Sequence, residues 1–175
     1  ATRLTDGGLG HLQGLTKLEN LDLGSTHVSD AGLVYLTAMT ALTELGLGHT
    51  KVTDDGLQHL QGLTGLVFLR LSDTRIAGPG LEYLKAISSL RDLDLSGTQV
   101  TDASLEHLRR LTQLEQLDLS GTSVGDSGLV HLHGLPKLRE LHLRRSKVTD
   151  AGLEHLQGLT ALLHLDVQQT AIVGS

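Results

Sequence analysis

The chain of 175 residues contains no cysteine and no tryptophan, and only three of its residues are aromatic. The lack of cysteine excludes a disulfide-stapled scaffold and a metal site built on thiolates. Aromatic side chains normally supply much of the buried area of a globular core, so we expect a thin, repetitive core built from leucine. No apolar stretch approaches the roughly 18–20 residues that a membrane-spanning helix needs.

Other absences limit the cellular compartments and the classes of binding partner that we expect. The sequence has no recognisable signal peptide, and together with the lack of cysteine this favours an intracellular or bacterial setting. A net charge of −6 argues against a protein that binds nucleic acid through its overall charge. We therefore expect neither nucleic acid nor a membrane as a partner.

A repeat of 24 residues, without insertion or deletion, organises the chain, which we expect to form one domain over residues 1–175. The shared pattern is L-T-x-L-x-x-L-x-L-x-x-T-x-V-T-D-x-G-L-x-x-L-x-G. A partial unit covers residues 1–14, and a truncated last unit covers residues 159–175. The full units between them are unit 1 (15–38), unit 2 (39–62), unit 3 (63–86), unit 4 (87–110), unit 5 (111–134) and unit 6 (135–158).

Each unit divides into two halves with different periodicities. In the first half, leucines such as Leu21 and Leu23 alternate with polar residues, which predicts a short strand. In the second half, an aspartate such as Asp30 precedes a Gly-Leu-x-x-Leu segment, a pattern that predicts a helix with an aspartate N-cap. In unit 3 we expect Pro79 at or near the first helical position, where its missing N–H is not needed.

The two halves also predict the overall shape. One strand and one short helix cannot bury the leucines of a unit alone, so neighbouring units must stack. Parallel strands stack about 4.8 Å apart, whereas packed helices need about 8–10 Å. The predicted fold is therefore an α/β solenoid, a horseshoe with a parallel sheet on its concave face and short helices on its convex face.

Two segments, "LENLDLGSTHV" (18–28) and "LEQLDLSGTSV" (114–124), resemble the L-x-x-L-x-L-x-x-N-x-L segment of the leucine-rich repeat family. The segment "TDAGLEHL" (149–156) is similar to the helical half of bacterial and F-box-type members, and the resemblance covers essentially the entire chain. In place of the family's asparagine ladder, this chain has hydroxyl residues that we expect to satisfy buried turn backbone between units. This ladder comprises Thr26, Thr50, Thr74, Thr98, Thr122, Ser146 and Thr170.

No cysteine-containing cap of the kind found in this family is present. We therefore expect the leucine-rich C-terminal end to be exposed, which would allow end-to-end self-association.

Subtracting the structural positions leaves the outward residues of the strands and of the turns that follow them. Units 4 and 5 carry small residues and aspartate there, whereas units 2, 3 and 6 carry larger, charged or aromatic residues. Such residues on a concave sheet are typical of a protein-binding surface, although neutral drift at solvated positions explains the sequence equally well. The candidate contact residues are His49, Phe68, Arg70, Asp73, Arg75, Asp94, Asp118, His142, Arg144, Arg145, Lys147 and Asp166.

Unit 6 is the most basic part of this candidate surface. It contains five basic and three acidic residues, and its segment "LHLRRSKVTD" (141–150) has basic or titratable residues at the outward positions. This composition predicts a protein partner with an acidic surface. The strand spacing further predicts Arg70 beside Asp94 and places His142 between Asp118 and Asp166.

Metal binding and catalysis find no support in the pattern. The histidines that recur at one helical position (His11, His59, His107, His131 and His155) are replaced there by tyrosine in two units. Neighbouring positions of this kind lie about 8–10 Å apart, too far for shared metal ligation. The chain has no cysteine nucleophile, no Gly-x-Ser-x-Gly elbow and no His-Glu-x-x-His pair. We expect no enzyme activity, no cofactor and no metal site.

The sequence thus predicts a non-catalytic module that binds a protein partner through its concave sheet. Two alternatives stay open. The chain could be the substrate-recognition segment of a larger enzyme, such as a ubiquitin-ligase adaptor or a bacterial effector. It could also be a structural or engineered repeat scaffold without a ligand.

Overall fold

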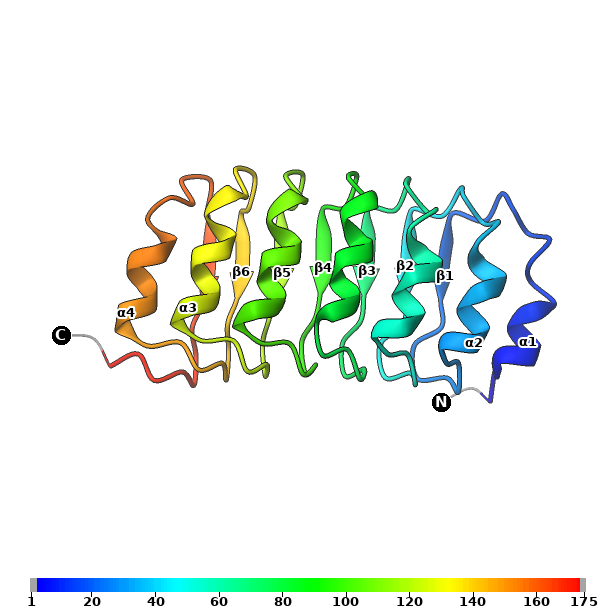
Figure 1. Cartoon of the computed structure of the whole chain (residues 1–175), viewed down its shortest axis with the longest axis horizontal. Coiled ribbons are helices and arrows are strands. Elements are labelled where there is room, and N and C mark those ends of the chain that lie inside the picture. Colours follow the sequence, from blue (N-terminus) through cyan, green and yellow to red (C-terminus); the bar gives the residue numbers. More distant parts are fainter. Residues whose placement is uncertain (1–2, 174–175) are drawn as a thin grey trace.

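The structure, a computed structural model, describes residues 3–173 and contains one open sheet with short helices on one side (Figure 1). The outermost residues of the expected first and last units, 1–2 and 174–175, lie outside the described residues. The sheet is parallel, its strands pair in chain order, and each pairing joins residues 24 positions apart. The strands are β1 (Asn20–Asp22), β2 (Glu44–Gly46), β3 (Phe68–Arg70), β4 (Asp92–Asp94), β5 (Gln116–Asp118), β6 (Glu140–His142) and β7 (His164–Asp166).

The helices are short, and many are of the 3₁₀ type. Each helical segment has its apolar residues at i and i+3, and three residues per turn align such a pair on one side of the helix. The α-helices are α1 (Asp6–Gly10), α2 (Asp30–Leu33), α3 (Asp126–Leu129) and α4 (Asp150–Leu153). The 3₁₀ helices are η1 (Val34–Leu36), η2 (Asp54–Leu60), η3 (Pro79–Ala86), η4 (Asp102–Arg110), η5 (Val130–Gly134) and η6 (Glu154–Leu156).

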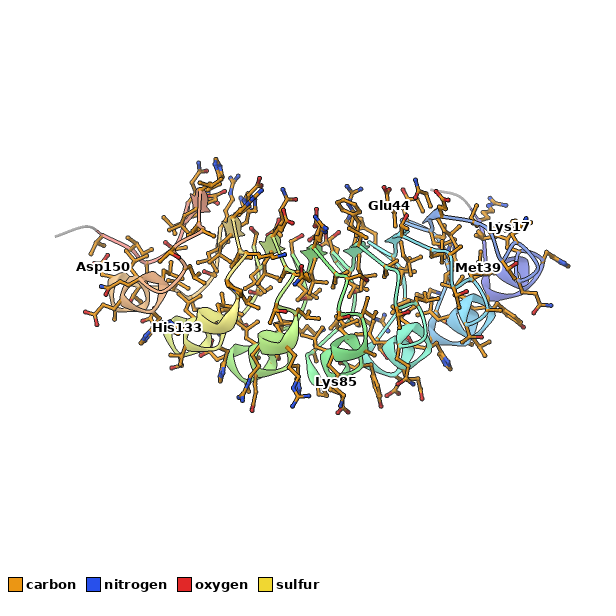
Figure 2. The ribbon with its side chains drawn as sticks, turned by 90° about the horizontal axis from the view of Figure 1, so that it is seen from above. Lys17, Met39, Glu44, Lys85, His133 and Asp150 are labelled. Carbon is orange, nitrogen blue, oxygen red and sulfur yellow. The ribbon has the colours of Figure 1, made fainter. Side chains whose placement is uncertain are left out.

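The helices lie on the outer side of a gentle arc and the strands on its inner side (Figure 2). This arrangement confirms the predicted solenoid, with its sheet on the concave face. Leucines fill the space between the two layers, and those of the central units are fully buried, as are Leu93 and Leu117. In the last unit, Leu163 is 81% exposed and Leu165 is 38% exposed, which agrees with the expected open end. End-to-end association through this end stays a prediction.

The aspartates that begin the helices are not N-caps, contrary to the prediction. The cap of η2 is Thr53, whose hydroxyl accepts the N–H of Asp55. The carboxylate of Asp30, at the first position of α2, instead accepts the N–H and the hydroxyl of Thr53 in the next unit, at 2.8 and 2.7 Å. The Asp126 carboxylate makes the same two bonds to Thr149. These aspartates join successive units, and the N-cap of each helix is the residue before the aspartate, with a side-chain cap bond accepted by Thr53 in η2 and by Thr149 in α4.

Unit 3 lacks this carboxylate, and the following unit compensates for it. Gly78 occupies the aspartate position, and Pro79 begins η3 as predicted. Ser104 stands where the other full units have glycine, and its hydroxyl accepts the N–H of Thr101 at 3.2 Å and donates to the carbonyl of Ala77 at 3.1 Å. Gly78 has a φ of 127°, and a Cβ there would collide with Ser104. The serine therefore replaces the missing carboxylate at this junction.

The hydroxyl ladder forms within units rather than between them, which corrects the prediction. The Thr50 hydroxyl donates to the carbonyl of Leu47 at 2.6 Å, and the other ladder threonines make the equivalent bond. In unit 6 the Ser146 hydroxyl is buried without a hydrogen-bond partner in the described part of the chain. Serine lacks the β-methyl group that restricts the threonine rotamer, so its hydroxyl is not held toward the carbonyl.

Candidate functional site

The inner face of the sheet presents two rows of side chains, because the first and third residues of each strand point away from the leucine core. The first row consists of Asn20, Glu44, Phe68, Asp92, Gln116, Glu140 and His164. The second row consists of Asp22, Gly46, Arg70, Asp94, Asp118, His142 and Asp166. Apart from Phe68, the sequence analysis missed the first row. The alternation of side chains along a strand was the available signal, since each of these residues lies two positions before a second-row residue.

Aspartates of the second row hold the turns that follow their strands. The Asp118 carboxylate accepts the N–H of Ser120 at 2.8 Å, and Asp94 accepts both the N–H and the hydroxyl of Ser96, at 2.9 and 2.6 Å. Asp22 and Asp166 bind the N–H two residues later in the same way. A second-row aspartate is therefore first a structural residue of its own unit.

Units 2, 3 and 6 have replaced this aspartate with Gly46, Arg70 and His142. The turns that follow these residues consequently lack the carboxylate acceptor found in the other units. These are the same units in which the sequence analysis placed the unusual outward residues. The units that have lost the turn hydrogen bond are thus the units that carry unusual side chains on the inner face.

The register places His142 between Asp118 and Asp166, as predicted, and Arg70 beside Asp94. The neighbouring carboxylates, however, are directed at their own turns. The imidazole Nε2 of His142 lies 3.9 Å from an oxygen of Glu140 in the first row. Its ring also lies 6.0 Å, between centroids, from the ring of His164. His142 therefore belongs to a cluster with two first-row residues that sequence reasoning had not named.

Three candidate residues occupy one strained backbone position in the turns. His49, Asp73 and Arg145 have φ values of 55°, 52° and 56°, in the left-handed region, where units 4 and 5 have glycine. Holding a side chain in this conformation costs of order 1 kcal/mol. His49 Nε2 lies 3.5 Å from Asp73 Oδ2, and Arg145 donates through Nε to the Gln169 amide oxygen.

The remaining candidates lie near the same turns. The Nε of Arg144 is buried without a hydrogen-bond partner among residues 3–173. Arg75 and Lys147 are exposed and form isolated parallel bridges with the preceding units. The structure thus gathers His142, Arg144, Arg145 and Lys147 around one turn of unit 6.

A hollow of about 510 Å³ opens on the inner face over β1 to β4. Gly46 lies in it, between Asp22 and Arg70 of the second row, while Glu44, Phe68 and Asp92 line it from the first row. Burial raises the pKa of Asp92; the Arg70 guanidinium opposes this effect, and neighbouring carboxylates add to it. The hollow therefore combines an exposed aromatic ring with incompletely compensated negative charge.

The described residues contain no group of three or more histidine, aspartate or glutamate side chains placed to hold a metal ion. The same part of the chain contains no helix that is both long and apolar enough to cross a membrane. The site is instead an open surface, whose chemistry is that of exposed charges, three imidazoles and one phenyl ring.

A sequence model described as "Leucine Rich repeat" matches residues 14–36, 38–60, 86–108, 110–132 and 134–156, which is more than half of the chain. The chain belongs to the leucine-rich repeat family. The matched segments of this leucine-rich repeat protein leave out most of unit 3, which carries Phe68 and Arg70. Membership supports a protein-interaction module in general, a role that is typically not enzymatic. No curated protein matches the chain at a significant level.

Two similar solved structures are internalins of Listeria monocytogenes. The leucine-rich repeat chain aligns with an internalin (inlF) at a TM-score of 0.72 and 25% identity, covering 90% of this chain and 50% of that one. It aligns with an internalin C2 (inlC2) at a TM-score of 0.72 and 24% identity, covering 95% of this chain and 77% of that one. The chain thus spans only half the length of the first of these proteins.

Proposed function

We propose that this leucine-rich repeat protein binds a protein partner through the concave surface of its sheet, without catalysis. The face is open, and the family supports an interaction role in general. The proposed contact residues are His49, Phe68, Arg70, Asp73, Arg75, Asp94, Asp118, His142, Arg144, Arg145, Lys147 and Asp166.

One observation carries the proposal: the turn-holding aspartate is absent in units 2, 3 and 6. A hydrogen bond of this kind contributes about 0.5–1.5 kcal/mol of stability. Gly46, Arg70 and His142 each give up that contribution. Neutral drift would scatter such losses, whereas here they fall in the units that also carry large or charged residues at the next outward positions. The same coincidence argues against a repeat scaffold without a ligand.

The strained turn residues support the same conclusion. In units 4 and 5, Gly97 and Gly121 adopt the left-handed conformation freely, with φ values of 66° and 69°. His49, Asp73 and Arg145 adopt it despite their side chains. Ser25 of unit 1 and Gln169 of the last unit share this conformation, but their units keep Asp22 and Asp166. What distinguishes units 2, 3 and 6 is that they combine the conformation with the loss of the second-row aspartate.

The partner that suits unit 6 presents acidic groups. Arg144, Arg145 and Lys147 bring three positive charges to one turn. Charges of opposite sign across an interface accelerate association and select the partner. We therefore expect binding to weaken as salt is added.

Charge reversal in unit 6 tests the proposal. The variant Arg144→Glu/Arg145→Glu is compared with wild type, first in affinity capture and then by titration of the retained partner. We expect about a tenfold loss of affinity or more, and a weaker salt dependence, since two charges at the interface change sign.

The matched control is Arg109→Glu/Arg110→Glu, which makes the same charge change at two exposed residues of η4 on the convex side. The control should bind within about twofold of wild type, because distant exposed charges are largely screened. Equal losses in both variants, or no loss in either, would rule out the concave surface of unit 6 as the contact.

A further inference from the structure

The first row carries an unusual triplet across β2, β3 and β4. Glu44 pairs in register with Phe68, and Phe68 pairs with Asp92. Neighbouring strands are about 4.8 Å apart, so one phenyl ring is flanked on either side by a carboxylate. All three residues line the hollow over Gly46.

The ring of this triplet is exposed, although the chain has few aromatic residues to bury. Phe68 is the only phenylalanine in the sequence, and it is 42% exposed. The two tyrosines, in contrast, pack against the core. A phenyl face of this kind can contact both the aliphatic stem and the charged end of a lysine or arginine side chain.

Among the described residues, the two carboxylates of the triplet make no direct side-chain contact with a cation, although the Arg70 guanidinium partly offsets the charge of Asp92. Within residues 3–173, no hydrogen bond or direct ion pair involves the side chain of Glu44 or Asp92. The third carboxylate of the hollow, that of Asp22, accepts the N–H of Gly24. Arg70 is the only basic residue among those that line the hollow, so the hollow has an excess of negative charge.

We propose that this hollow binds a lysine or arginine side chain of the protein partner, over Phe68 and between Glu44 and Asp92. The inference rests on the proposed function, because it assigns one contact of that same surface. Burial raises the pKa of Asp92, and a bound cation would offset the cost of its ionisation.

The two ends of the concave face would then select opposite charges. The proposed cation position lies over Phe68 in β3, and the basic turn of unit 6 follows β6, three strands away. Three strand steps correspond to about 14 Å, which an extended peptide spans in four to five residues. A matching partner presents a basic side chain and an acidic group at that separation.

Small probes test the hollow without the partner. The isotope-labelled chain is titrated with N-acetyl-arginine amide and followed by the NMR signals of Gly46, Phe68 and Asp92. The neutral isostere N-acetyl-citrulline amide and the acidic N-acetyl-glutamate amide serve as comparison probes. We expect saturable shifts with the arginine probe, weaker ones with the citrulline probe and none with the glutamate probe.

Two variants locate the site. Asp92→Asn should weaken arginine-probe binding about two- to fivefold, the range expected for one partly screened charge contact. Gly46→Asn should abolish binding by filling the hollow. Its Cβ would meet the Asp22 carboxylate, which must turn aside to make room, so thermal unfolding of this variant is measured alongside to check that the unit stays folded. The control Asp55→Asn removes a negative charge from the exposed side of η2 and should leave the shifts unchanged.

Equal binding of the arginine and citrulline probes would overturn the inference, because the charge would then be irrelevant. Stronger shifts with the glutamate probe would also overturn it, since Arg70 would then make the hollow a site for acidic groups. Charge reversal at Arg144 and Arg145 should not affect these titrations. Failure here thus leaves the proposed function standing, and failure of the unit 6 contact leaves this site standing.

Discussion

In unit 5 the leucines Leu117 and Leu119 are fully buried, and so are their counterparts Leu141 and Leu143 in unit 6. The outward residue between each pair differs. Asp118 holds its turn through the N–H of Ser120, whereas His142 faces Glu140 and His164. The two units therefore have the same core but different inner faces.

This difference shows how a repeat protein can change its surface without changing its fold. The leucines of a unit are buried by both neighbouring units, so each leucine position constrains three units at once. An outward residue constrains only its own turn and the residues beside it on the sheet. Substitutions at outward positions therefore cost less stability than substitutions of core leucines. A binding surface can accordingly be built there one unit at a time.

The largest expected effect on stability tests whether the leucines of units 5 and 6 are packed equally well. Leu117→Ala and Leu141→Ala should each lower the free energy of unfolding by about 2–5 kcal/mol, because each leaves a cavity in a fully buried position. Urea denaturation measures both variants. A much smaller loss for Leu141→Ala would mean that unit 6 is a loosely packed repeat, and the comparison of the two units would fail.

A smaller effect is expected at the junction between the two units. Asp126 of unit 5 accepts the N–H and the hydroxyl of Thr149 in unit 6, and the hydrogen bond from the Thr149 N–H lowers the pKa of Asp126. The ionised carboxylate therefore stabilises the fold above its ordinary pKa of 3.8, and this stabilisation is lost as the pH falls through the lowered value.

Asp126→Asn should accordingly cost about 1–2 kcal/mol near neutral pH, as expected for hydrogen bonds to a partly exposed charged group. The difference from wild type should shrink as the pH is lowered through the ordinary pKa of 3.8 and on through the lowered pKa of the native carboxylate. Unfolding free energies measured across that range test this. A difference that stayed constant would show that the ionisation of Asp126 does not couple the units.

The sequence predicted the order and spacing of the strands because every unit repeats the same leucine positions. It misplaced the helix caps because Thr149 and Asp150 are both good cap residues and stand side by side. What distinguishes them is that such an aspartate, as at Asp126, binds the next unit, 23 residues later. A local pattern does not contain that contact.

The candidate surface was predicted only in part, for a related reason. Outward residues were counted from the position between the two strand leucines onward, which found Arg70 and His142 but left out Glu44, Asp92 and His164. The role of the second-row aspartates is local and was readable in segments such as Asp94-Leu95-Ser96, where a carboxylate precedes an N–H by two residues. The hollow over Gly46 depends on three adjacent strands and could not be read from one unit.

The smallest effect on stability is expected when Asp118 of unit 5 and His142 of unit 6 are each replaced by the residue of the other unit. His142→Asp should raise the free energy of unfolding by about 0.5–1 kcal/mol, because an aspartate there can accept the N–H of Arg144 as Asp118 accepts that of Ser120. Asp118→His should lower it by a similar amount. Both are measured by denaturation at moderate salt, since a third carboxylate beside Asp118 and Asp166 introduces repulsion that salt reduces.

The two substitutions should change stability in opposite directions. Their effects on partner binding should not mirror each other. His142→Asp should weaken partner binding by removing a basic group from unit 6, while Asp118→His gains none of the other unit 6 residues and should not create a second site. If His142→Asp failed to stabilise the protein, the aspartate contact would not be the reason that generic units keep that residue. The coincidence of lost turn contacts and new surface chemistry would then carry no functional meaning.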